Sequence, residues 1–328
     1  MSSEKPLVLV LGATGKTGQS IVRGLLRSEK FRIAALIRPS SLSKPATEQL
    51  RTSGIDIRAG DITDDYESLK KTLQGVDTLI SSVFALLIEQ QKDIFRAAKE
   101  LGVKRVVPCD FGTPGARGVR VLHDMKLAMR DFVKDLGVPY TFIDVGWWMQ
   151  YYLPLPLRST IPEAKKQKNW QIYGPGDKPI LVTNVEHVGE YVAQIITDKR
   201  TVNQAVIIWE DEASQLKARE IGERVSGDSD ALEAKRVHLN PEDITRWTAE
   251  GRAHVGARIR SLEDYSKHLQ YDYHYSMHVL HECTLENAKR LGYLDAHELY
   301  PDIRQQSLEE YANEFYALGE PGQYYLRD

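Results

Sequence analysis

Apolar runs and amphipathic helical patterns alternate regularly over the first 150 residues of the chain. The apolar runs are four to six residues long and fall at positions 7–11, 32–37, 55–59, 77–82, 104–107 and 140–144. Helical patterns occupy the stretches between them, at positions 16–28, 46–52, 66–73, 89–101 and 122–136. Because short strands that alternate with helices form right-handed βαβ units, the pattern predicts an α/β fold with a doubly wound parallel sheet.

The alternation weakens after residue 150, where Pro154 and Pro156 interrupt regular backbone hydrogen bonding. The later predicted elements are a helix at 185–196, a strand at 205–209, and helices at 218–225 and 285–291. We therefore expect a sheet domain over residues 1–155 and a smaller mixed α/β region over residues 156–328. This division allows strands from the second region to join the sheet of the first.

Composition excludes several classes of protein. The chain has 328 residues, with 43 Lys and Arg against 46 Asp and Glu, a formal net charge of −3. This balance does not favour binding to nucleic acid through phosphate neutralisation. No apolar run reaches the roughly 18 residues that a membrane-spanning helix needs, and two cysteines are too few for a disulfide scaffold. We expect a cytoplasmic globular protein with no nucleic-acid or membrane partner.

The strongest motif is Gly12-Ala-Thr-Gly15-Lys-Thr-Gly18, which joins the first strand to the first helix. Glycines in such a turn let the backbone approach a pyrophosphate, whose charge is met by the free N–H groups of the helix N-terminus. A P-loop would need a glycine five residues before Gly15, but position 10 is Val. The alternative is a plain strand-to-helix turn. We predict a dinucleotide-binding (Rossmann) site that uses Gly12, Thr14, Gly15, Lys16, Thr17 and Gly18.

The end of the second strand indicates which dinucleotide binds. Enzymes that use NAD usually have an acidic residue there, which accepts a hydrogen bond from the ribose 2′-hydroxyl. This chain instead has Arg38, followed by Lys44. Because a guanidinium pairs well with a 2′-phosphate, we predict NADP(H) as the cofactor. A solvated arginine at the end of the strand is the alternative.

Further motifs along the first half resemble a known family. They are Leu36-Ile-Arg-Pro39, Gly60-Asp-Ile62, Val107-Pro-Cys-Asp-Phe-Gly112, Lys126 and Gly137-Val-Pro-Tyr-Thr141. With the glycine turn, they resemble the NmrA-like and isoflavone-reductase-like branch of the atypical short-chain dehydrogenases, mainly over residues 7–155. Phenylcoumaran benzylic ether reductases and pinoresinol reductases of this family carry a Pro-Ser-Glu-Phe-Gly segment. The segment here, Pro108-Cys-Asp-Phe-Gly112, differs from it at two positions.

The resemblance implies roles for individual residues. Residues 12–18 would hold the pyrophosphate, and Arg38 with Lys44 would hold the 2′-phosphate. Asp61 and Ile62 would lie beside the adenine, and Ser82 and Val83 beside the nicotinamide half. Lys92 matches a lysine that contacts the cofactor in regulatory members of the family. The residues implied near the nicotinamide ring are Lys126, Trp147, Trp148 and Gln150.

Lys126 is the candidate for proton transfer. In the reductases that the chain resembles, a lysine at this place is the proposed general acid or base, whereas in non-catalytic relatives it only binds the nicotinamide ribose. Both roles stay open. The tyrosine that classical short-chain dehydrogenases place four residues earlier is replaced by Leu122. We expect burial beside a cationic nicotinamide ring to lower the pKa of Lys126 toward neutrality.

Polar and aromatic residues mark a candidate substrate region. Asp110 and Phe111 follow the fifth strand, at the edge where ligands bind in doubly wound sheets. His123 shares a helical face with Lys126 and is a candidate relay, although we expect a surface histidine. Tyr151 and Tyr152 follow the two tryptophans and favour a flat apolar ligand.

A cluster of Tyr and His lies later in the chain and is a candidate wall of the substrate pocket. Its members are Tyr265, His268, Tyr271, Tyr273, His274, Tyr275, His278 and His281, of which Tyr271 and His274 are the substrate candidates. A helix would place His274, His278 and His281 on one face, as a zinc site needs. Because no carboxylate or cysteine pattern completes a known signature, no metal is predicted.

These residues support two main functional hypotheses. The first is an NADPH-dependent oxidoreductase that transfers a hydride to a small aromatic or conjugated metabolite, with Lys126 as general acid or base. The second is a sensor of the NmrA type, which binds NADP(H) and signals to a protein partner without catalysis. A redox-neutral enzyme on the same fold is a third alternative, and a homodimer is left open. The aromatic residues and the reductase-like segment 108–112 favour the reductase.

Overall fold

A five-stranded parallel sheet forms the first half of the chain. The structure is a computed structural model that describes residues 5–256, 258–261, 263–264 and 270–326. The strands lie in the order β3-β2-β1-β4-β5, and every pairing between them is parallel. The first strand therefore lies between β2 and β4, and chain order runs outward from it in both directions. The predicted doubly wound parallel sheet is confirmed.

The helices and strands of this half lie within a few residues of their predicted positions. The strands are β1 (Leu7–Leu11), β2 (Arg32–Ile37), β3 (Asp56–Ala59), β4 (Thr78–Ser81) and β5 (Arg105–Val107). The helices are α1 (Lys16–Ser28), α2 (Pro45–Thr52), α3 (Tyr66–Thr72), α4 (Gln91–Glu100) and α5 (Val121–Leu136), with 3-10 turns η1 (Pro39–Ser41) and η2 (Ala85–Leu87). All five residues of β1 are buried, as a strand covered on both faces requires.

The sheet continues into the second half of the chain. A parallel bridge joins Val106 to Tyr140, directly before β6 (Thr141–Val145). This strand pairs with β10 (Gln204–Ile208), which in turn pairs with β13 (Tyr293–Asp295), and both pairings are parallel. Two strands from beyond residue 155 thus extend the first sheet. The division of the chain into domains at that residue stays a prediction.

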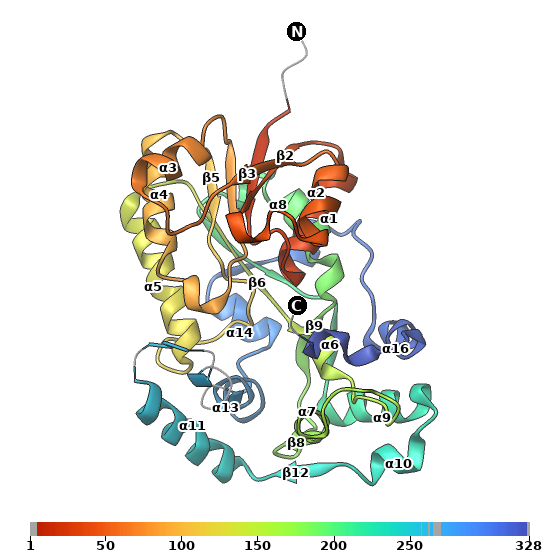
Figure 1. The fold of residues 1–328 in the computed structure, drawn as a ribbon. Coiled ribbons are helices and arrows are strands. Elements are labelled where there is room, and N and C mark those ends of the chain that lie inside the picture. Colours follow the sequence, from red (N-terminus) through yellow and green to blue (C-terminus); the bar gives the residue numbers. More distant parts are fainter. Residues whose placement is uncertain (1–4, 257, 262, 265–269, 327–328) are drawn as a thin grey trace.

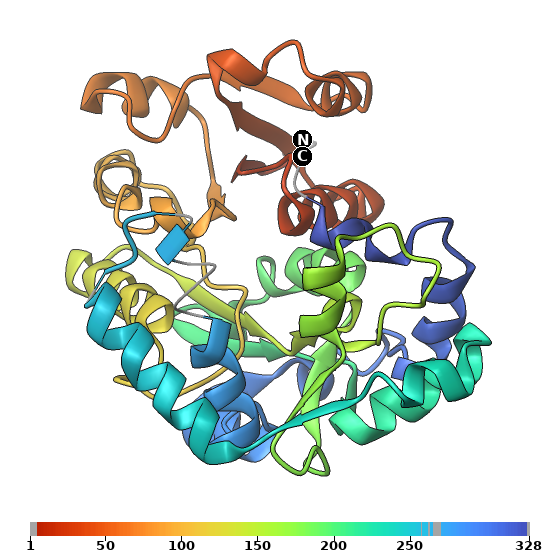
Figure 2. The ribbon, with the colours of Figure 1, turned by 60° about the horizontal axis from the view of Figure 1, so that its bottom comes forward.

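The remaining elements of the second half are short. The strands are β7 (Trp147–Trp148), β8 (Gln171–Tyr173), β9 (Ile180–Thr183), β11 (Asp211–Ala213) and β12 (Val237–Leu239). The α-helices are α6 (Met149–Tyr152), α7 (Glu163–Asn169), α8 (Val188–Ile195), α9 (Gln215–Ser226), α10 (Ser229–Glu233), α11 (Pro241–Val255), α13 (Gln270–His274), α14 (Leu285–Arg290), α15 (Ala296–Leu299) and α16 (Leu308–Ala317). The 3-10 helices are η3 (Val185–His187), η4 (Lys199–Thr201) and η6 (Pro321–Tyr325), and η5 (Tyr275–Val279) is a π-helix. Figures 1 and 2 show the N-terminal strands at one end of the molecule and α11, β12 and α10 at the other.

Helix α8 from the second half packs directly on α1 (Figure 1). Two glycines make this contact close: a Cβ added at Gly24 would lie 2.0 Å from the Gly189 carbonyl oxygen. The Ser20 hydroxyl donates to the Glu186 carbonyl oxygen at 2.9 Å and accepts from the Gly189 N–H at 3.0 Å. The first helix is therefore fixed by both halves of the chain.

None of the helices in the described ranges combines the length and the apolar composition that a membrane crossing requires.

Candidate active site at the carboxyl edge of the sheet

The three glycines of the turn between β1 and α1 have different roles. Gly12 has a φ of +73°, and a Cβ added there would lie 2.5 Å from the Ser82 carbonyl oxygen. A Cβ added at Gly18 would lie 2.1 Å from the Gly12 carbonyl oxygen. Gly15 is exposed, and a Cβ there would meet only the Gly12 carbonyl oxygen, at 3.3 Å. Gly12 and Gly18 thus shape the turn, whereas Gly15 keeps its outer face bare.

The start of α1 offers hydrogen-bond donors at this bare face. Its N-cap is Gly15, which has no capping side chain, and its first turn contains no acidic residue. The first N–H groups of a helix lack intrahelical acceptors and carry partial positive charge. Lys16 and Thr17 lie in this first turn, and Thr14 is held from behind by the Gln19 amide, which donates to its carbonyl oxygen at 2.8 Å. This arrangement fits the pyrophosphate of a dinucleotide.

Arg38 and Lys44 both lie exposed in the segment that follows β2. Within the described part of the chain, neither side chain makes a hydrogen bond or an ion pair, so both cations are available to a ligand. Asp61, at the end of the neighbouring strand, accepts from the Thr63 N–H at 3.0 Å and from the Thr63 hydroxyl at 2.8 Å. Ile62 is buried in the core below it. The roles of these residues toward the 2′-phosphate and the adenine stay predictions.

The residues after β4 join the turn to the centre of the sheet edge. The Ser82 hydroxyl donates to the Leu11 carbonyl oxygen at 2.9 Å, beside Gly12. The Val83 carbonyl oxygen accepts from the Cys109 thiol at 3.0 Å. Lys92 is half-buried on α4, with its ammonium 5.8 Å from the centre of the Phe132 ring of α5.

Lys126 is buried near the start of α5, and its ammonium donates to the Asp110 carbonyl oxygen. Burial lowers the pKa of Lys126, but the acidic group of Tyr273 and further acids nearby outweigh this effect, so the pKa lies above its ordinary value. The further acids are Cys109, Asp110 and Asp144. The expected lowering of this pKa is therefore wrong for the protein alone, because the sequence does not show that these acids surround the lysine. The effect of an adjacent cationic nicotinamide ring stays a prediction.

A buried ionic network lies beneath the lysine. Arg130 Nε lies 3.1 Å from an Asp110 carboxylate oxygen, and its Nη2 lies 2.9 Å from Asp144. The same guanidinium donates to the Tyr293 hydroxyl at 2.6 Å, which donates to Asp144 at 2.5 Å. Burial raises the pKa of Asp110 to about 6, although Arg130 opposes this shift. The Asp110 side chain thus belongs to this network, and its backbone oxygen holds Lys126.

Phe111 has a strained backbone, and His123 is buried where a surface position was expected. Phe111 has a φ of +41°, a strained conformation for a residue with a Cβ, and its N–H donates to the Ile143 carbonyl oxygen at 2.8 Å. This bend turns Asp110 and Gly112 toward Lys126. The expectation of a surface histidine is wrong: His123 is 2% exposed and its Nε2 bonds to the Gly115 carbonyl oxygen at 2.9 Å. Burial and nearby cations lower its pKa well below the ordinary value.

The aromatic residues after β6 divide into two groups. Trp148 stacks on Tyr151 with ring centres 5.6 Å apart, and Trp147 lies 6.3 Å from the Tyr151 ring. All three are half-buried. Tyr152 is buried, and its hydroxyl donates to the Ala213 carbonyl oxygen at 3.0 Å. The rings of the first group keep part of their surface exposed, whereas the Tyr152 hydroxyl is bonded within the core.

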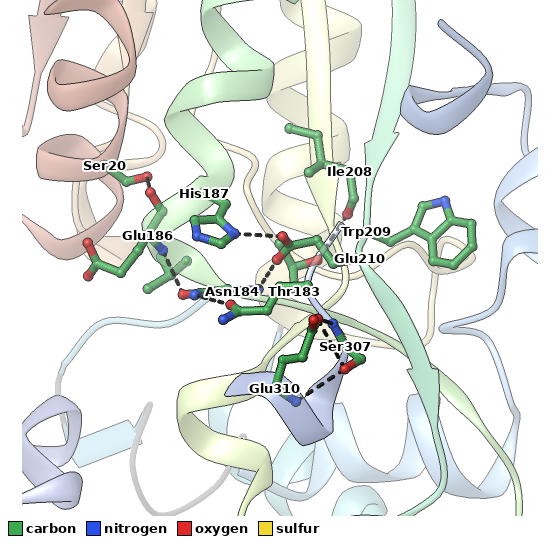
Figure 3. A network of polar contacts seen from close by, with 12 residues as sticks. Ser20, Thr183, Asn184, Glu186, His187, Ile208, Trp209, Glu210, Ser307 and Glu310 are labelled. Carbon is green, nitrogen blue, oxygen red and sulfur yellow. Dashed lines mark hydrogen bonds and ion pairs between the residues drawn. The ribbon is translucent and has the colours of Figure 1, made fainter. Parts of the chain in front are cut away.

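Gln150 is part of a buried hydrogen-bond network with Asn184 and Glu210. Its amide donates to the Asn184 side chain at 2.5 Å, and the Asn184 N–H donates to Glu210 at 2.7 Å. Figure 3 shows Asn184 and His187 converging on Glu210. The hydrogen bond that His187 donates to the Glu210 carboxylate raises the pKa of His187. Gln150 therefore supports the segment between Trp148 and Tyr151 from within.

The Tyr and His cluster packs against the tryptophans. Tyr265 and His268 lie outside the described residues. Tyr273 and His274 lie with their ring centres 5.7 Å and 6.0 Å from Trp147, and His274 stacks on Tyr173 at 3.6 Å. Tyr271 instead packs on Trp247, 4.9 Å away. His274 and Tyr273 are thus close to the candidate site, and Tyr271 faces α11.

The predicted helical face of three histidines does not form. His274 ends α13 and His278 lies in the π-helix η5, whereas His281 has a φ of +55° beyond it. In the described ranges, no group of three or more His, Cys, Asp or Glu residues is arranged to hold a metal ion.

Comparisons with known proteins establish the family of the chain. Residues 4–312 match the NmrA-like family, and the chain belongs to it, as the sequence motifs predicted. Relatives include the asnovolin J 5′,6′-dehydrogenase nvfM of Aspergillus novofumigatus, 32% identical over 322 residues that cover 94% of each protein. Phenylcoumaran benzylic ether reductase Betv6 of Betula pendula is 25% identical over 331 residues, covering 95% of this chain and 99% of that protein.

Solved structures show the same fold. The binary complex of leucoanthocyanidin reductase with NADPH from Vitis vinifera matches with a TM-score of 0.75 at 20% identity, covering 95% of this chain and 100% of that one. Apo AtPrR2 matches with a TM-score of 0.69 at 22% identity, covering 95% and 100% respectively.

Proposed function

We propose that this protein is an NADPH-dependent reductase that acts on a small aromatic or conjugated metabolite. The observation that carries the proposal is the position of Lys126, a buried cation that lies beside Gly112 together with Tyr273, whose half-buried ring packs on Trp147. The named activities of the relatives, a dehydrogenase and several reductases, support the same class. The solved complex of leucoanthocyanidin reductase with NADPH supports the cofactor.

Different residues of the chain have different roles in the proposed reaction. When bound, NADPH supplies the hydride. The turn and α1 would hold its pyrophosphate, and Arg38 and Lys44 its 2′-phosphate, which discriminates against NADH. The aromatic rings would position a flat substrate and exclude water. Lys126 holds the proton that the substrate needs after it has received the hydride.

Transfer of deuterium tests the proposal. The protein would be incubated with NADPH deuterated on the nicotinamide ring and a small-molecule extract of its source organism, and products would be searched by mass spectrometry. A product one mass unit heavier, formed only with active protein, is the expected result. Lys126→Met should abolish its formation and leave the Kd for NADPH within about tenfold, or about 1.4 kcal/mol. No labelled product from protein that binds NADPH would favour the sensor or the redox-neutral enzyme instead.

A further inference from the structure

Tyr273 and Lys126 approach the same point of the candidate site from two different helices. A methyl group added at Gly112 would lie 3.3 Å from Lys126 Nζ and 3.8 Å from the Tyr273 hydroxyl oxygen. The two residues are 147 positions apart in the chain and come from α5 and α13. Lysine and tyrosine tips are therefore brought together beside the strained segment Asp110–Gly112.

The position of Tyr273 is fixed by its neighbour in sequence. One Asp272 carboxylate oxygen accepts from the N–H of Val121, the first residue of α5, at 2.9 Å. The other accepts from Arg252 Nε of α11 at 3.1 Å. Asp272 is 2% exposed, so both bonds are shielded from water. This carboxylate holds α13 to the start of the helix that carries Lys126.

Tyr273 is also distinguished from the other tyrosines around the site. The hydroxyls of Tyr151, Tyr152 and Tyr293 are each bonded to a protein oxygen. The Tyr273 hydroxyl makes no hydrogen bond to any residue that the structure describes. Its ring lies 4.9 Å from the buried Arg120 guanidinium and 5.7 Å from Trp147. The ring is therefore held in place while its hydroxyl is available to a ligand.

We propose that Tyr273 is the catalytic acid that protonates the reduced substrate, and that Lys126 restores its proton. The proposal rests on the proposed reductase function. For a substrate with a carbonyl group conjugated to a double bond, the hydride from NADPH adds to carbon and leaves an enolate oxygen. The Tyr273 O–H bond breaks and an O–H bond forms on that oxygen. The phenolate then takes a proton from the Lys126 ammonium, which regains one from water, so one NADPH and one proton are consumed in each turnover.

This tyrosine and lysine pair differs from that of the classical short-chain dehydrogenases, which Leu122 rules out in this chain. A tyrosine four residues before Lys126 would lie on the same helix, whereas Tyr273 reaches the lysine from α13. The structure thus assigns a tyrosine and lysine pair to a chain whose local sequence contains none. The titratable and charged groups around the pair are Cys109, Asp110, Arg120, His123, Arg130 and Asp144.

Tyr273→Phe tests the proposal, with benzylideneacetone as the probe and deuterated NADPH as the reductant. We expect kcat to fall at least about 100-fold, the usual minimum for loss of a general acid, and the Kd for NADPH to stay within about threefold. Tyr300→Phe is the matched control, since this half-buried tyrosine lies outside the candidate site and its hydroxyl donates to Asp198 at 3.1 Å. It should keep kcat within about threefold of the wild type.

A second measurement does not depend on turnover. Titration of the protein without cofactor, labelled with ¹⁵N-lysine, would follow Lys126 by NMR. Because Tyr273 raises the pKa of Lys126, this pKa should be lower in Tyr273→Phe than in the wild type and unchanged in Tyr300→Phe. An unchanged pKa would show that the two groups do not face each other and would overturn the proposed pair, whatever the kinetics.

The kinetic outcomes separate the inference from the function on which it rests. If the wild type labels benzylideneacetone and Tyr273→Phe does so at an unchanged rate, Tyr273 is not the acid and the reductase proposal stands. If the wild type labels neither this probe nor any compound of the extract, the reductase proposal fails and the assignment of Tyr273 fails with it.

Discussion

Arg38 is the side chain on which the preference for NADP(H) depends. It is exposed after β2, and a guanidinium–phosphate hydrogen bond contributes about 1.5–3 kcal/mol. Arg38→Glu should therefore raise the Kd for NADPH by about 10- to 100-fold or more, because it also introduces repulsion. The Kd for NADH should change by less than about threefold. Fluorescence titration with both nucleotides measures the difference.

Arg27→Glu provides the control for overall charge, since Arg27 is also exposed but lies in the last turn of α1. It changes the net charge by the same amount and should affect neither nucleotide. Equal losses of NADPH and NADH affinity in Arg38→Glu would contradict a role at the 2′-phosphate.

Asp110 makes the stability of the fold depend on pH. Burial raises its pKa to about 6, so the folded protein binds this proton more tightly than the unfolded chain, whose Asp titrates near 4. The carboxyl group therefore stabilises the fold most at low pH, and this contribution is lost as the pH rises through about 6. Asp110→Asn removes the titration and leaves Arg130 with Asp144.

The free energy of unfolding should consequently change relative to the wild type between pH 5 and pH 8. The free energy of unfolding of Asp110→Asn, taken relative to that of the wild type, should rise by about 1 kcal/mol from pH 5 to pH 8, as the shift of the pKa implies. Urea denaturation at both pH values measures this difference, in which the titration of all other groups cancels. A difference between the two proteins that is the same at pH 5 and pH 8 would falsify the raised pKa.

The sequence located the glycine turn between β1 and α1 but not the acids around Lys126. Gly12, Gly15 and Gly18 lie within one segment of seven residues, so local spacing was sufficient to find them. Tyr273 belonged to a recognised cluster, but nothing in its spacing shows that Asp272 binds the start of α5. His123 was misjudged because helical periodicity indicates a shared face and not which side of the helix other segments cover.

Within the turn between β1 and α1, we expect Gly15 to matter for cofactor binding and Gly18 for the stability of the fold. Gly15 has a φ of −76° and is the N-cap of α1, a position that Asp favours. Gly15→Asp should leave the free energy of unfolding within about 1 kcal/mol of the wild type. It should raise the Kd for NADPH by more than about tenfold, because a carboxylate would occupy the place of the pyrophosphate and repel it.

Gly18→Ala, at the same turn, should instead lower the stability of the fold. Its Cβ would lie 2.1 Å from the Gly12 carbonyl oxygen, and overpacking of this kind costs about 1–3 kcal/mol or more. Thermal unfolding and NADPH titration of the two variants compare the effects directly. A large loss of stability in Gly15→Asp would mean that its outer face is not bare.

Among the secondary-structure elements, those with a strong period were predicted and those defined by distant partners were not. The predicted helix 16–28 and strand 32–37 have the observed bounds of α1 and β2. Helices α11 and α16 were not predicted. In α11 only four of the fifteen residues are buried. Helix α16 was missed although Ser307 and Glu310 form a capping box at its start. The strands β7, β8, β12 and β13 have two or three residues each, so pairing with neighbours decides them and no local pattern does.

The whole chain is joined by a core that both halves share. One buried cluster contains Val8 and Ile21 from the first half together with Val188, Val206 and Ala296 from the second. The parallel sheet also crosses residue 155 through β6 and β10. Since neither half could be removed without exposing this cluster, we expect the protein to unfold as a single cooperative unit.

Binding of NADPH at the glycine turn provides the test of this cooperativity. At 100 times its Kd the nucleotide should stabilise the native state by about 2.7 kcal/mol. All five tryptophans lie at residue 147 or later, so their fluorescence reports mainly on the other half of the chain. We expect NADPH to shift the unfolding transition seen by tryptophan fluorescence to the same extent as the transition seen by far-UV circular dichroism. Two transitions, of which only one moves with NADPH, would instead mean that the halves fold independently and that the shared core contributes little to their coupling.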